Sequence, residues 1–101
     1  MKNFGAYPTH PGEVIKDEIE YRGISQRALA KEIGMSATAL NEILNAKRPV
    51  TTATAFLFEA ALDIPAYSLC RLQLQYDLQT VPCDSKLKAR LASIRRISAI
   101  L

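Results

Sequence analysis

The chain has 101 residues, of which 49% are apolar and 23% are charged, and these shares favour one compact domain. Thirteen Lys and Arg against ten Asp and Glu give a net charge of +3, and the apolar share, near the globular average, argues against disorder over most of the length. No apolar run approaches the roughly 20 residues of a membrane span. Met1 leads into Gly5 and Pro8 rather than an apolar signal core. The sequence therefore predicts a soluble, cytoplasmic protein without a membrane partner.

The excess of basic residues is local. Residues 85–101 carry five bases and no acid, and residues 25–50 carry more bases than acids, whereas residues 1–24 and 51–84 are acidic overall. A local basic patch suits a nucleic acid, because bound Lys and Arg displace its condensed counterions. An ordinary solvated tail has the same composition, so charge alone favours nucleic-acid binding only slightly.

Capping residues and glycines divide the first half of the chain into three short helices. The expected N-caps, whose side chains accept a hydrogen bond from a free backbone amide, are His10, Ser25 and Ser36. Gly23 and Gly34 end the first two helices, in the position where a left-handed residue closes a helix. Pro49 forbids continuation of the third helix.

The second half predicts two more helices, and strand-like alternation is absent throughout. Thr51 or Thr52 can cap a fourth helix. Its apolar residues run through Phe56, Leu57, Ala60 and Leu62. Pro65 opens a fifth helix. The expected core-facing stripe of this helix consists of Leu69, Leu72, Tyr76 and Val81. Residues 81–84 are interpreted as a linker.

Residues 25–45 carry the functional prediction, because two short helices flank the turn formed by Gly34, Met35 and Ser36. Two helices cross steeply through such a turn only if the residue at the crossing is small, as Ala30 is, and Gly34 allows the sharp reversal. Met35 is expected to fill the space under the turn. The core below the crossing consists of Leu29, Ile33, Leu40 and Ile43. The pattern suits a helix-turn-helix, although an αα-corner that binds only proteins has similar spacing.

This segment resembles the helix-turn-helix of the Xre and phage-repressor family. The resemblance implies an all-α fold, a five-helix phage-repressor-like domain with an additional basic C-terminal helix or tail. We place the DNA-binding domain at residues 1–84, with the motif at 25–45, and the extension at 85–101.

Three flanking segments narrow the resemblance to HigA-type antitoxins, over residues 8–80. They are HPGE at 10–13, NAKRPVT at 45–51 and QLQYDL at 73–78. The resemblance implies a DNA-binding antitoxin that forms a homodimer, binds double-stranded operator DNA and represses its own promoter. It would neutralise a RelE-like HigB toxin, an mRNA-cleaving ribonuclease encoded beside it. A stand-alone Xre regulator without a toxin is the alternative.

The fifth helix departs from the family pattern. The family has a Ser or Thr before the proline and an aromatic-Trp pair soon after it, whereas this chain has Ile64 there and no Trp. Since the fifth helix contributes to the dimer in the family, its packing here is expected to differ in detail.

The outer face of the third helix is the candidate DNA-reading surface. The candidate base-contacting residues are Ser36, Ala37, Thr38, Asn41 and Asn45. A recognition helix enters the major groove with its N-terminal end at the bases. The amide of Asn41 suits a bidentate contact with adenine, and the methyl group of Thr38 or Ala37 suits a thymine methyl. Glu42 either accepts from a cytosine amino group or, as we favour, pairs internally, for instance with Lys31 or Arg27.

Residues beside this face are candidates for phosphate contacts, which set register without reading sequence. They are Gln26, Arg27, Lys47 and Arg48, and plain solvation is the alternative for each.

On the first helix, Glu13, Asp17 and Glu20 form one stripe that would match a basic toxin. A solvated face, with Glu13 complementing the helix dipole, is an equally good interpretation.

The chain has few residues suited to catalysis. One His and two Cys supply no metal-ligand set, no Ser-His-Asp constellation and no phosphate-binding glycine loop, so we expect no enzyme activity, cofactor, metal or small-molecule substrate. His10 and Glu13 have a spacing that could hold a metal, but helix capping explains both better. Cys70 and Cys83 are interpreted as small buried apolar residues.

The basic extension also carries an apolar pattern. Leu87, Leu91, Ile94 and Leu101 fall at heptad-like spacing, interrupted by Ser98, which allows an amphipathic helix. Such a helix either packs on a partner, which we favour over phosphate contacts, or is a frayed end.

Overall fold

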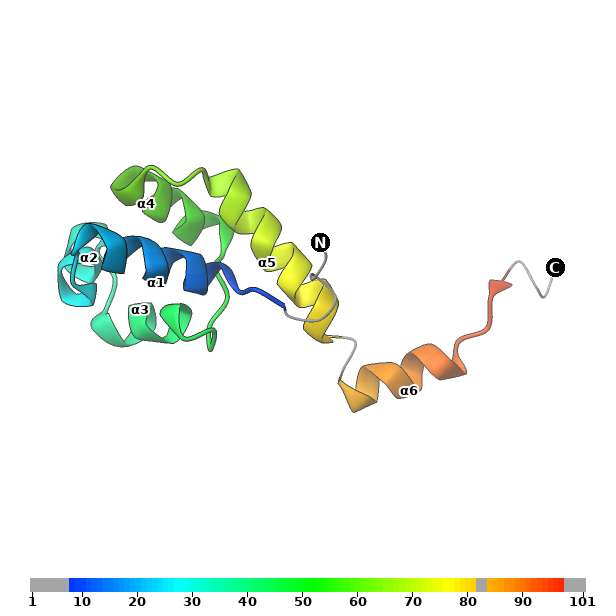
Figure 1. Ribbon diagram of the computed structural model, residues 1–101. Coiled ribbons are helices and arrows are strands. Elements are labelled where there is room, and N and C mark those ends of the chain that lie inside the picture. Colours follow the sequence, from blue (N-terminus) through cyan, green and yellow to red (C-terminus); the bar gives the residue numbers. More distant parts are fainter. Residues whose placement is uncertain (1–7, 82–83, 98–101) are drawn as a thin grey trace.

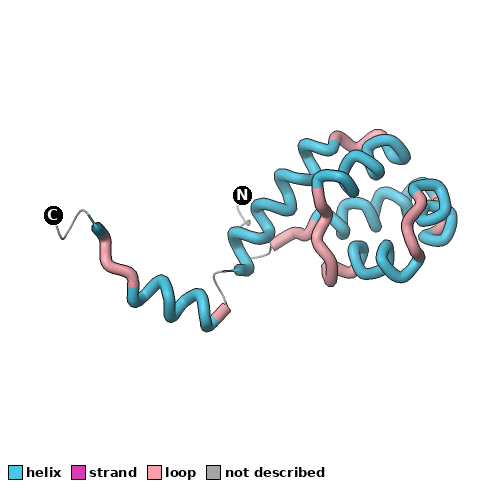
Figure 2. The backbone as a smooth tube through the Cα atoms, turned by 180° about the vertical axis from the view of Figure 1, so that it is seen from behind, coloured by secondary structure: helices cyan, strands magenta, loops and turns pink. Residues whose placement is uncertain are grey.

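The computed structural model describes residues 8–81 and 84–97, and within these ranges it contains helices and loops but no strand (Figures 1 and 2). The helices are α1 (Pro11–Arg22), α2 (Gln26–Ile33), α3 (Ala37–Leu44), α4 (Thr52–Leu62), α5 (Ala66–Thr80) and α6 (Ser85–Ser93). The first five pack into one bundle, and α6 extends away from it (Figure 1). The predicted all-α fold class is confirmed.

The helix ends follow the capping residues in the sequence. The hydroxyl groups of Ser25, Ser36 and Thr51 each accept a hydrogen bond from the backbone amide three residues later, at 3.1, 3.1 and 3.2 Å. Gly23 and Gly34 close α1 and α2 with φ angles of 70° and 71°. This left-handed conformation costs glycine little, so the chain can reverse between α1, α2 and α3 within a few residues.

The apolar core lies among the five helices of the bundle, and each of them contributes to it. It consists of Ile15, Ile19, Leu29, Ala30, Leu40, Ile43, Leu44, Val50, Ala55, Phe58, Leu62, Ala66 and Leu69. The residues predicted beneath the crossing of α2 and α3 are buried, except that Ile33 is only partly buried, as is Met35 at the turn; both pack against the core. The core therefore holds α3 against α1 and α2 and leaves the other face of α3 exposed to solvent.

The buried faces of α4 and α5 differ in part from the sequence prediction. On α4, Phe58 is fully buried, whereas Phe56 is 59% exposed and Leu57 is 40% exposed. Because α4 is apolar on nearly every side, its pattern does not select one face. On α5, the prediction for Val81 is wrong: it is 50% exposed, since it follows the last residue of the helix, beyond the core. Leu69 is buried as predicted.

The helix α6 is shorter than the heptad-like pattern predicts. Asp84 caps it by accepting a hydrogen bond from the amide of Lys86 at 2.9 Å, and no residue of α6 is buried. The helix ends at Ser93, so the prediction that Ile94 belongs to it is wrong. Ser98, Leu101, Cys83 and part of the predicted linker lie outside the described residues. Within the described part, no helix is long and apolar enough to cross a bilayer.

Candidate nucleic-acid interface

The turn between α2 and α3 fixes the direction of α3. After the left-handed residue Gly34, the amide of Met35 donates to the carbonyl oxygen of Ala30 at 2.9 Å, which closes the end of α2. Ala30 itself is 4% exposed, so a small side chain sits at the crossing as the motif requires. The next residue, Ser36, already caps α3. Local hydrogen bonds and a small residue at the crossing thus set the direction of α3 relative to α2.

All five candidate base-contacting residues lie on the exposed side of α3. They are Ser36, Ala37, Thr38, Asn41 and Asn45. The opposite side of the same helix carries Leu40, Ile43 and Leu44, each at most 1% exposed. The helix therefore presents a polar face with small residues at its N-terminal end, which is the end that can approach base edges most closely.

Besides Ser36, whose hydroxyl group caps α3, two of these side chains are held by hydrogen bonds. Asn41 Nδ2 donates to Gln26 Oε1 at 3.2 Å, so the first residue of α2 orients an amide on α3. Asn45 Nδ2 donates to the carbonyl oxygen of Asn41 at 2.9 Å. Asn45 lies at the C-terminal end of α3, whereas Thr38 and Asn41 lie nearer its start.

Glu42 pairs internally, but with a different partner from either one predicted. Both Nε and Nη2 of Arg48 donate to Glu42 Oε1, at 2.9 and 2.6 Å. The expected internal pairing is therefore confirmed, although the partner is Arg48 and not Lys31 or Arg27, the examples that the sequence offered. The reason is the tight turn after α3, which brings Arg48 back beside the last turn of that helix; the amide of Lys47 donates to the Glu42 carbonyl oxygen at 2.8 Å.

The end of the loop after α3 is held by a residue of α5. Gln73 on α5 is 8% exposed, and its Oε1 accepts a hydrogen bond from the amide of Val50 at 2.8 Å. Its Nε2 donates to Asp77 Oδ1 at 2.9 Å. A buried backbone amide without a partner would cost about 1–3 kcal/mol, so Gln73 is the residue that allows Val50 to be buried at the end of this loop.

His10 connects the start of α1 to the same loop. Its Nδ1 accepts a hydrogen bond from the Gly12 amide at 2.9 Å, and its ring meets that of Tyr76 edge-on, with centroids 4.9 Å apart. A hydrogen bond with the backbone of Arg48 completes its surroundings. Burial lowers the pKa of His10 from 6.5, and the carboxylates of Glu13 and Asp77 and the bond to Arg48 oppose that shift only in part. The folded state therefore favours the neutral imidazole of His10, whose Nδ1 is free to accept the hydrogen bond.

Gly12 explains why α1 can lie so close to α3. A Cβ atom at this position would be 1.9 Å from the carbonyl oxygen of Ile43, a distance that no side chain tolerates. The three segments HPGE (10–13), NAKRPVT (45–51) and QLQYDL (73–78) therefore meet around His10 and Gln73. Gly12 and Gln73 appeared in the sequence analysis only as letters of those segments, and Tyr76 otherwise only in the expected core-facing stripe of the fifth helix, so the order of the segments was the available signal for a shared role.

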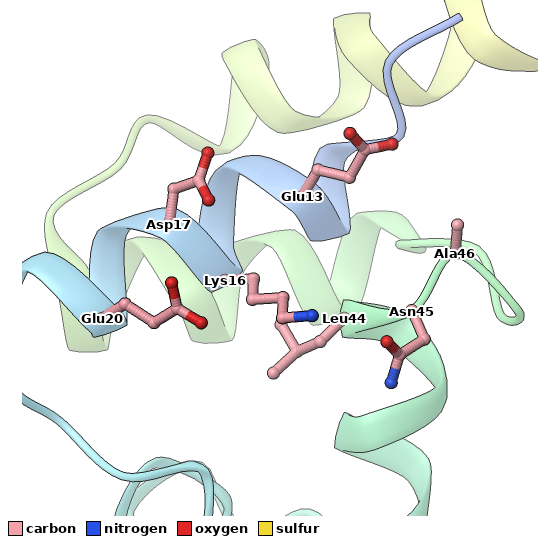
Figure 3. A pocket seen from close by; sticks show the side chains of 7 residues that line it. All are labelled: Glu13, Lys16, Asp17, Glu20, Leu44, Asn45 and Ala46. Atoms are coloured by element: carbon pink, nitrogen blue, oxygen red, sulfur yellow. The ribbon is translucent and has the colours of Figure 1, made fainter.

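The acidic stripe of α1 lies beside a surface hollow of about 480 Å³ (Figure 3). Its lining residues are Glu13, Lys16, Asp17, Glu20, Leu44, Asn45 and Ala46. Figure 3 shows Lys16 between the carboxylates and the end of α3, so the surface is not purely acidic. Glu13 Oε2 also accepts a hydrogen bond from the His10 amide at 3.4 Å, as a capping residue does.

A family model for helix-turn-helix proteins matches residues 15–69. The chain belongs to this family. Virulence-associated protein A' of Dichelobacter nodosus is 35% identical over 92 residues, which are 87% of this chain and 76% of that protein. The match spans the bundle, and the family assignment agrees with the turn geometry described above.

Solved structures of HigA-type antitoxins share the fold of this helix-turn-helix protein. The Pseudomonas aeruginosa antitoxin HigA, solved with the higBA promoter, is 29% identical, has a TM-score of 0.78 and covers 90% of this chain and 99% of its own. An addiction module antidote protein of a HigA family from Coxiella burnetii is 26% identical, with a TM-score of 0.74 and coverage of 88% and 97%. The predicted resemblance to HigA-type antitoxins is confirmed.

The described residues of this helix-turn-helix protein include no group of three or more His, Cys, Asp or Glu side chains placed to hold a metal ion. His10 and Glu13, whose spacing suggested that possibility, serve the first turn of α1 instead.

Proposed function

We propose that this helix-turn-helix protein is the antitoxin of a type II toxin-antitoxin module. It binds operator DNA as a homodimer, represses its own operon and neutralises a RelE-like, mRNA-cleaving toxin. Residues 1–84 form the DNA-binding domain and residues 85–101 a basic extension. The observation that carries the proposal is the exposed polar face of α3, on a fold shared with an antitoxin solved with its promoter.

In this proposal the N-terminal half of α3 reads the major groove. One hydrogen of Asn41 Nδ2 is donated to Gln26, which leaves the other hydrogen and Oδ1 for the N7 and N6 positions of adenine. Ser36, Ala37 and Thr38 are small enough to let the helix approach the bases. Asn45 Nδ2 donates one hydrogen to the α3 backbone, which leaves its other hydrogen and Oδ1 for a contact with a base.

Phosphate contacts come from residues beside the groove. Gln26 Nε2, Arg27 and Lys47 are the donors of this set, with Arg27 and Lys47 exposed. Arg48 contributes only after its guanidinium leaves the Glu42 carboxylate or shares it with a phosphate, because a charge-assisted pair at 2.6 Å competes directly. A homodimer places its two copies of α3 about 34 Å apart, one turn of DNA, so the operator is a near-palindrome.

The test uses duplex DNA from upstream of the gene and fluorescence anisotropy at several salt concentrations. Asn41→Ala should weaken binding by about 1–3 kcal/mol, a factor of about 5 to 150, and relax the choice of one base pair. Lys47→Ala should weaken binding to all sequences alike and reduce the salt slope by about one. Ser68→Ala, on the exposed side of α5, is the matched control and should bind as the unaltered chain does. Unchanged affinity and sequence preference in Asn41→Ala would contradict the assignment.

Toxin capture is tested separately, on the stripe of α1. Asp17 and Glu20 are exposed, so their reversal to Lys should leave the fold intact and weaken binding of a basic ribonuclease, because the attraction between the two surfaces is reversed. Glu32→Lys on α2 is the control with the same charge change. Calorimetry with the ribonuclease encoded beside the gene measures the affinity. Equal affinity for the variant and the control would remove the proposed toxin surface and leave DNA binding standing.

A further inference from the structure

The segment that begins with α6 carries a cluster of basic side chains without acidic partners. From residue 85 to residue 97 the charged residues are Lys86, Lys88, Arg90, Arg95 and Arg96, and all five are exposed. Neither of the two ion pairs within residues 8–81 and 84–97 includes any of them, so no described carboxylate neutralises this basic cluster. Such a concentration of unneutralised positive charge suits a polyanionic partner.

In α6 the basic residues lie at the edges of a side that carries only small residues. With about 100° of rotation per residue, that side consists of Ser85, Ala89, Ala92 and Ser93. Lys88 lies at one edge of it, and Lys86 and Arg90 lie at the other. Small side chains let a helix come close to a surface, while long basic side chains at both edges reach charges to either side. This arrangement suits the row of phosphates along one strand of a duplex.

The apolar side of α6 is too small to be its main contact surface. Its large apolar residues are Leu87 and Leu91, one turn apart, and Leu91 is 53% exposed. The sequence favoured packing on a partner because Ile94 extended the pattern, but the helix ends at Ser93. A helix that lies in a membrane surface has a broader apolar face, with Trp, Phe and several Leu side chains. Charge therefore favours DNA over a membrane surface or a protein partner.

The helix α5 leads α6 away from the part of the bundle that carries the proposed phosphate contacts. Tyr76 on α5 meets the ring of His10, which is hydrogen-bonded to the backbone of Arg48. The last turns of α5 therefore lie beside the loop that carries Lys47. From Tyr76, α5 continues for one more turn to Thr80, and α6 begins five residues later. Figure 1 shows α6 extending from this end of α5, with α3 and α6 both towards the lower edge of the view. A short connection thus joins the basic cluster to the DNA-facing loop.

We propose that α6 is a second DNA-binding element, which contacts phosphates that flank the bases read by α3. Its small side faces the sugar-phosphate backbone, and Lys86, Lys88 and Arg90 donate to phosphate oxygens on either side. This rests on the DNA binding of the proposed function and adds to it a contact outside the helix-turn-helix. Because phosphates carry no sequence information, α6 raises the affinity for every sequence and leaves base preference to α3.

The test is a triple variant with Lys86→Gln, Lys88→Gln and Arg90→Gln, titrated by fluorescence anisotropy at several salt concentrations. Gln is a good helix former, so α6 should persist. Each lost phosphate contact reduces the salt slope by about 0.9, so the slope should fall by about three for each bound chain. Affinity for the operator should fall by about tenfold or more, with the preference for operator over scrambled DNA unchanged. An unchanged salt slope would overturn the proposal.

A matched pair of single variants separates a local contact from a loss of net charge. Arg90→Gln on α6 and Arg71→Gln on α5 each remove one exposed positive charge. Arg90→Gln should reduce the salt slope by about one, whereas Arg71→Gln should leave it unchanged. Equal effects of the two substitutions would show that only net charge matters, and would refute a contact by α6.

The length of the duplex tests where α6 binds. One duplex ends at the bases read by α3, and a second extends it by about ten base pairs, one helical turn, on each side. The unaltered chain should bind the longer duplex more tightly, because α6 then finds flanking phosphates, and the triple variant should lose this gain. An equal gain for the triple variant would contradict a flanking contact.

Other partners of α6 give different results with the same triple variant. Vesicles of phosphatidylserine and phosphatidylcholine should not sediment the unaltered chain; vesicle binding that the triple variant loses, with DNA binding unchanged, would overturn the proposal. A change in self-association by sedimentation equilibrium, again with DNA binding unchanged, would do the same. If the unaltered chain prefers its operator but the triple variant keeps the full salt slope, only the α6 contact fails. If no operator preference exists and the triple variant still loses salt-dependent binding to all duplexes, operator recognition fails and the α6 contact stands.

Discussion

Replacing Gly12 with Ala should destabilise the fold for a steric reason alone. The new methyl group would lie 1.9 Å from the Ile43 carbonyl oxygen, so the start of α1 must move away from the end of α3. Forcing extra volume into a close-packed contact costs about 1–3 kcal/mol. The movement also stretches the hydrogen bond between the Gly12 amide and His10 Nδ1, a cap worth about 1 kcal/mol. The higher helix propensity of Ala offsets up to about 1 kcal/mol, so we expect a net loss of about 1–4 kcal/mol, centred near about 2.5 kcal/mol.

Urea unfolding followed by circular dichroism measures this loss, and Gly34→Ala is the informative control. At Gly34 no atom lies within 4 Å of an added Cβ, but the φ angle of 71° strains any other residue by about 1–2 kcal/mol. Gly12→Ala should therefore unfold at a lower urea concentration than Gly34→Ala, with an unchanged dependence on urea. If Gly12→Ala were as stable as the unaltered chain, the close approach of α1 and α3 would be refuted.

Three further predictions follow from the buried network and the pair beside α3. Gln73→Met should cost about 1–3 kcal/mol in the same urea assay, because the Val50 amide loses its acceptor. Gln73→Glu keeps the acceptor oxygen but sets a second carboxylate beside Asp77, so it should cost no less at neutral pH. Since burial lowers the pKa of His10, stability should hold above pH 6.5 and fall as the pH drops from there through the lower pKa of the folded state. Thermal unfolding from pH 7.5 to 5 should show this fall, and His10→Asn, which keeps a capping side chain, should lack it. Glu42→Gln should release Arg48 and tighten binding to all DNA sequences with a steeper salt slope, and unchanged anisotropy titrations would contradict this.

The sequence was sufficient for features that depend on near neighbours. Ser25, Ser36 and Thr51 each cap a helix through an amide three residues away, and Gly34 needs only its own backbone freedom to reverse the chain. The small residue Ala30 at the crossing follows from the same local geometry. For this reason the helix-turn-helix and the exposed side of α3 could be predicted without knowledge of the rest of the fold.

Contacts between distant residues could not be predicted in this way. The pairing of Arg48 with Glu42 depends on how tightly the chain turns after α3, and the sequence offered Lys31 and Arg27 as equally reasonable partners. The buried face of α4 depends on what packs against it, because Phe56 and Phe58 are equally apolar. In both cases the deciding information lies in the tertiary arrangement rather than in spacing along the chain.

The residues around His10 and Gln73 link the stability of the bundle to the DNA-facing surface. The turn after α2 fixes the start of α3, and the contacts of His10 with Arg48 and of Gln73 with Val50 fix the loop at its end. The loop carries Lys47, a proposed phosphate contact, whereas Asn41 is held by Gln26 on α2. A substitution at Gln73 should therefore disturb binding strength and salt dependence before it disturbs the base preference set by Asn41, because Asn41 is positioned from the other end of α3.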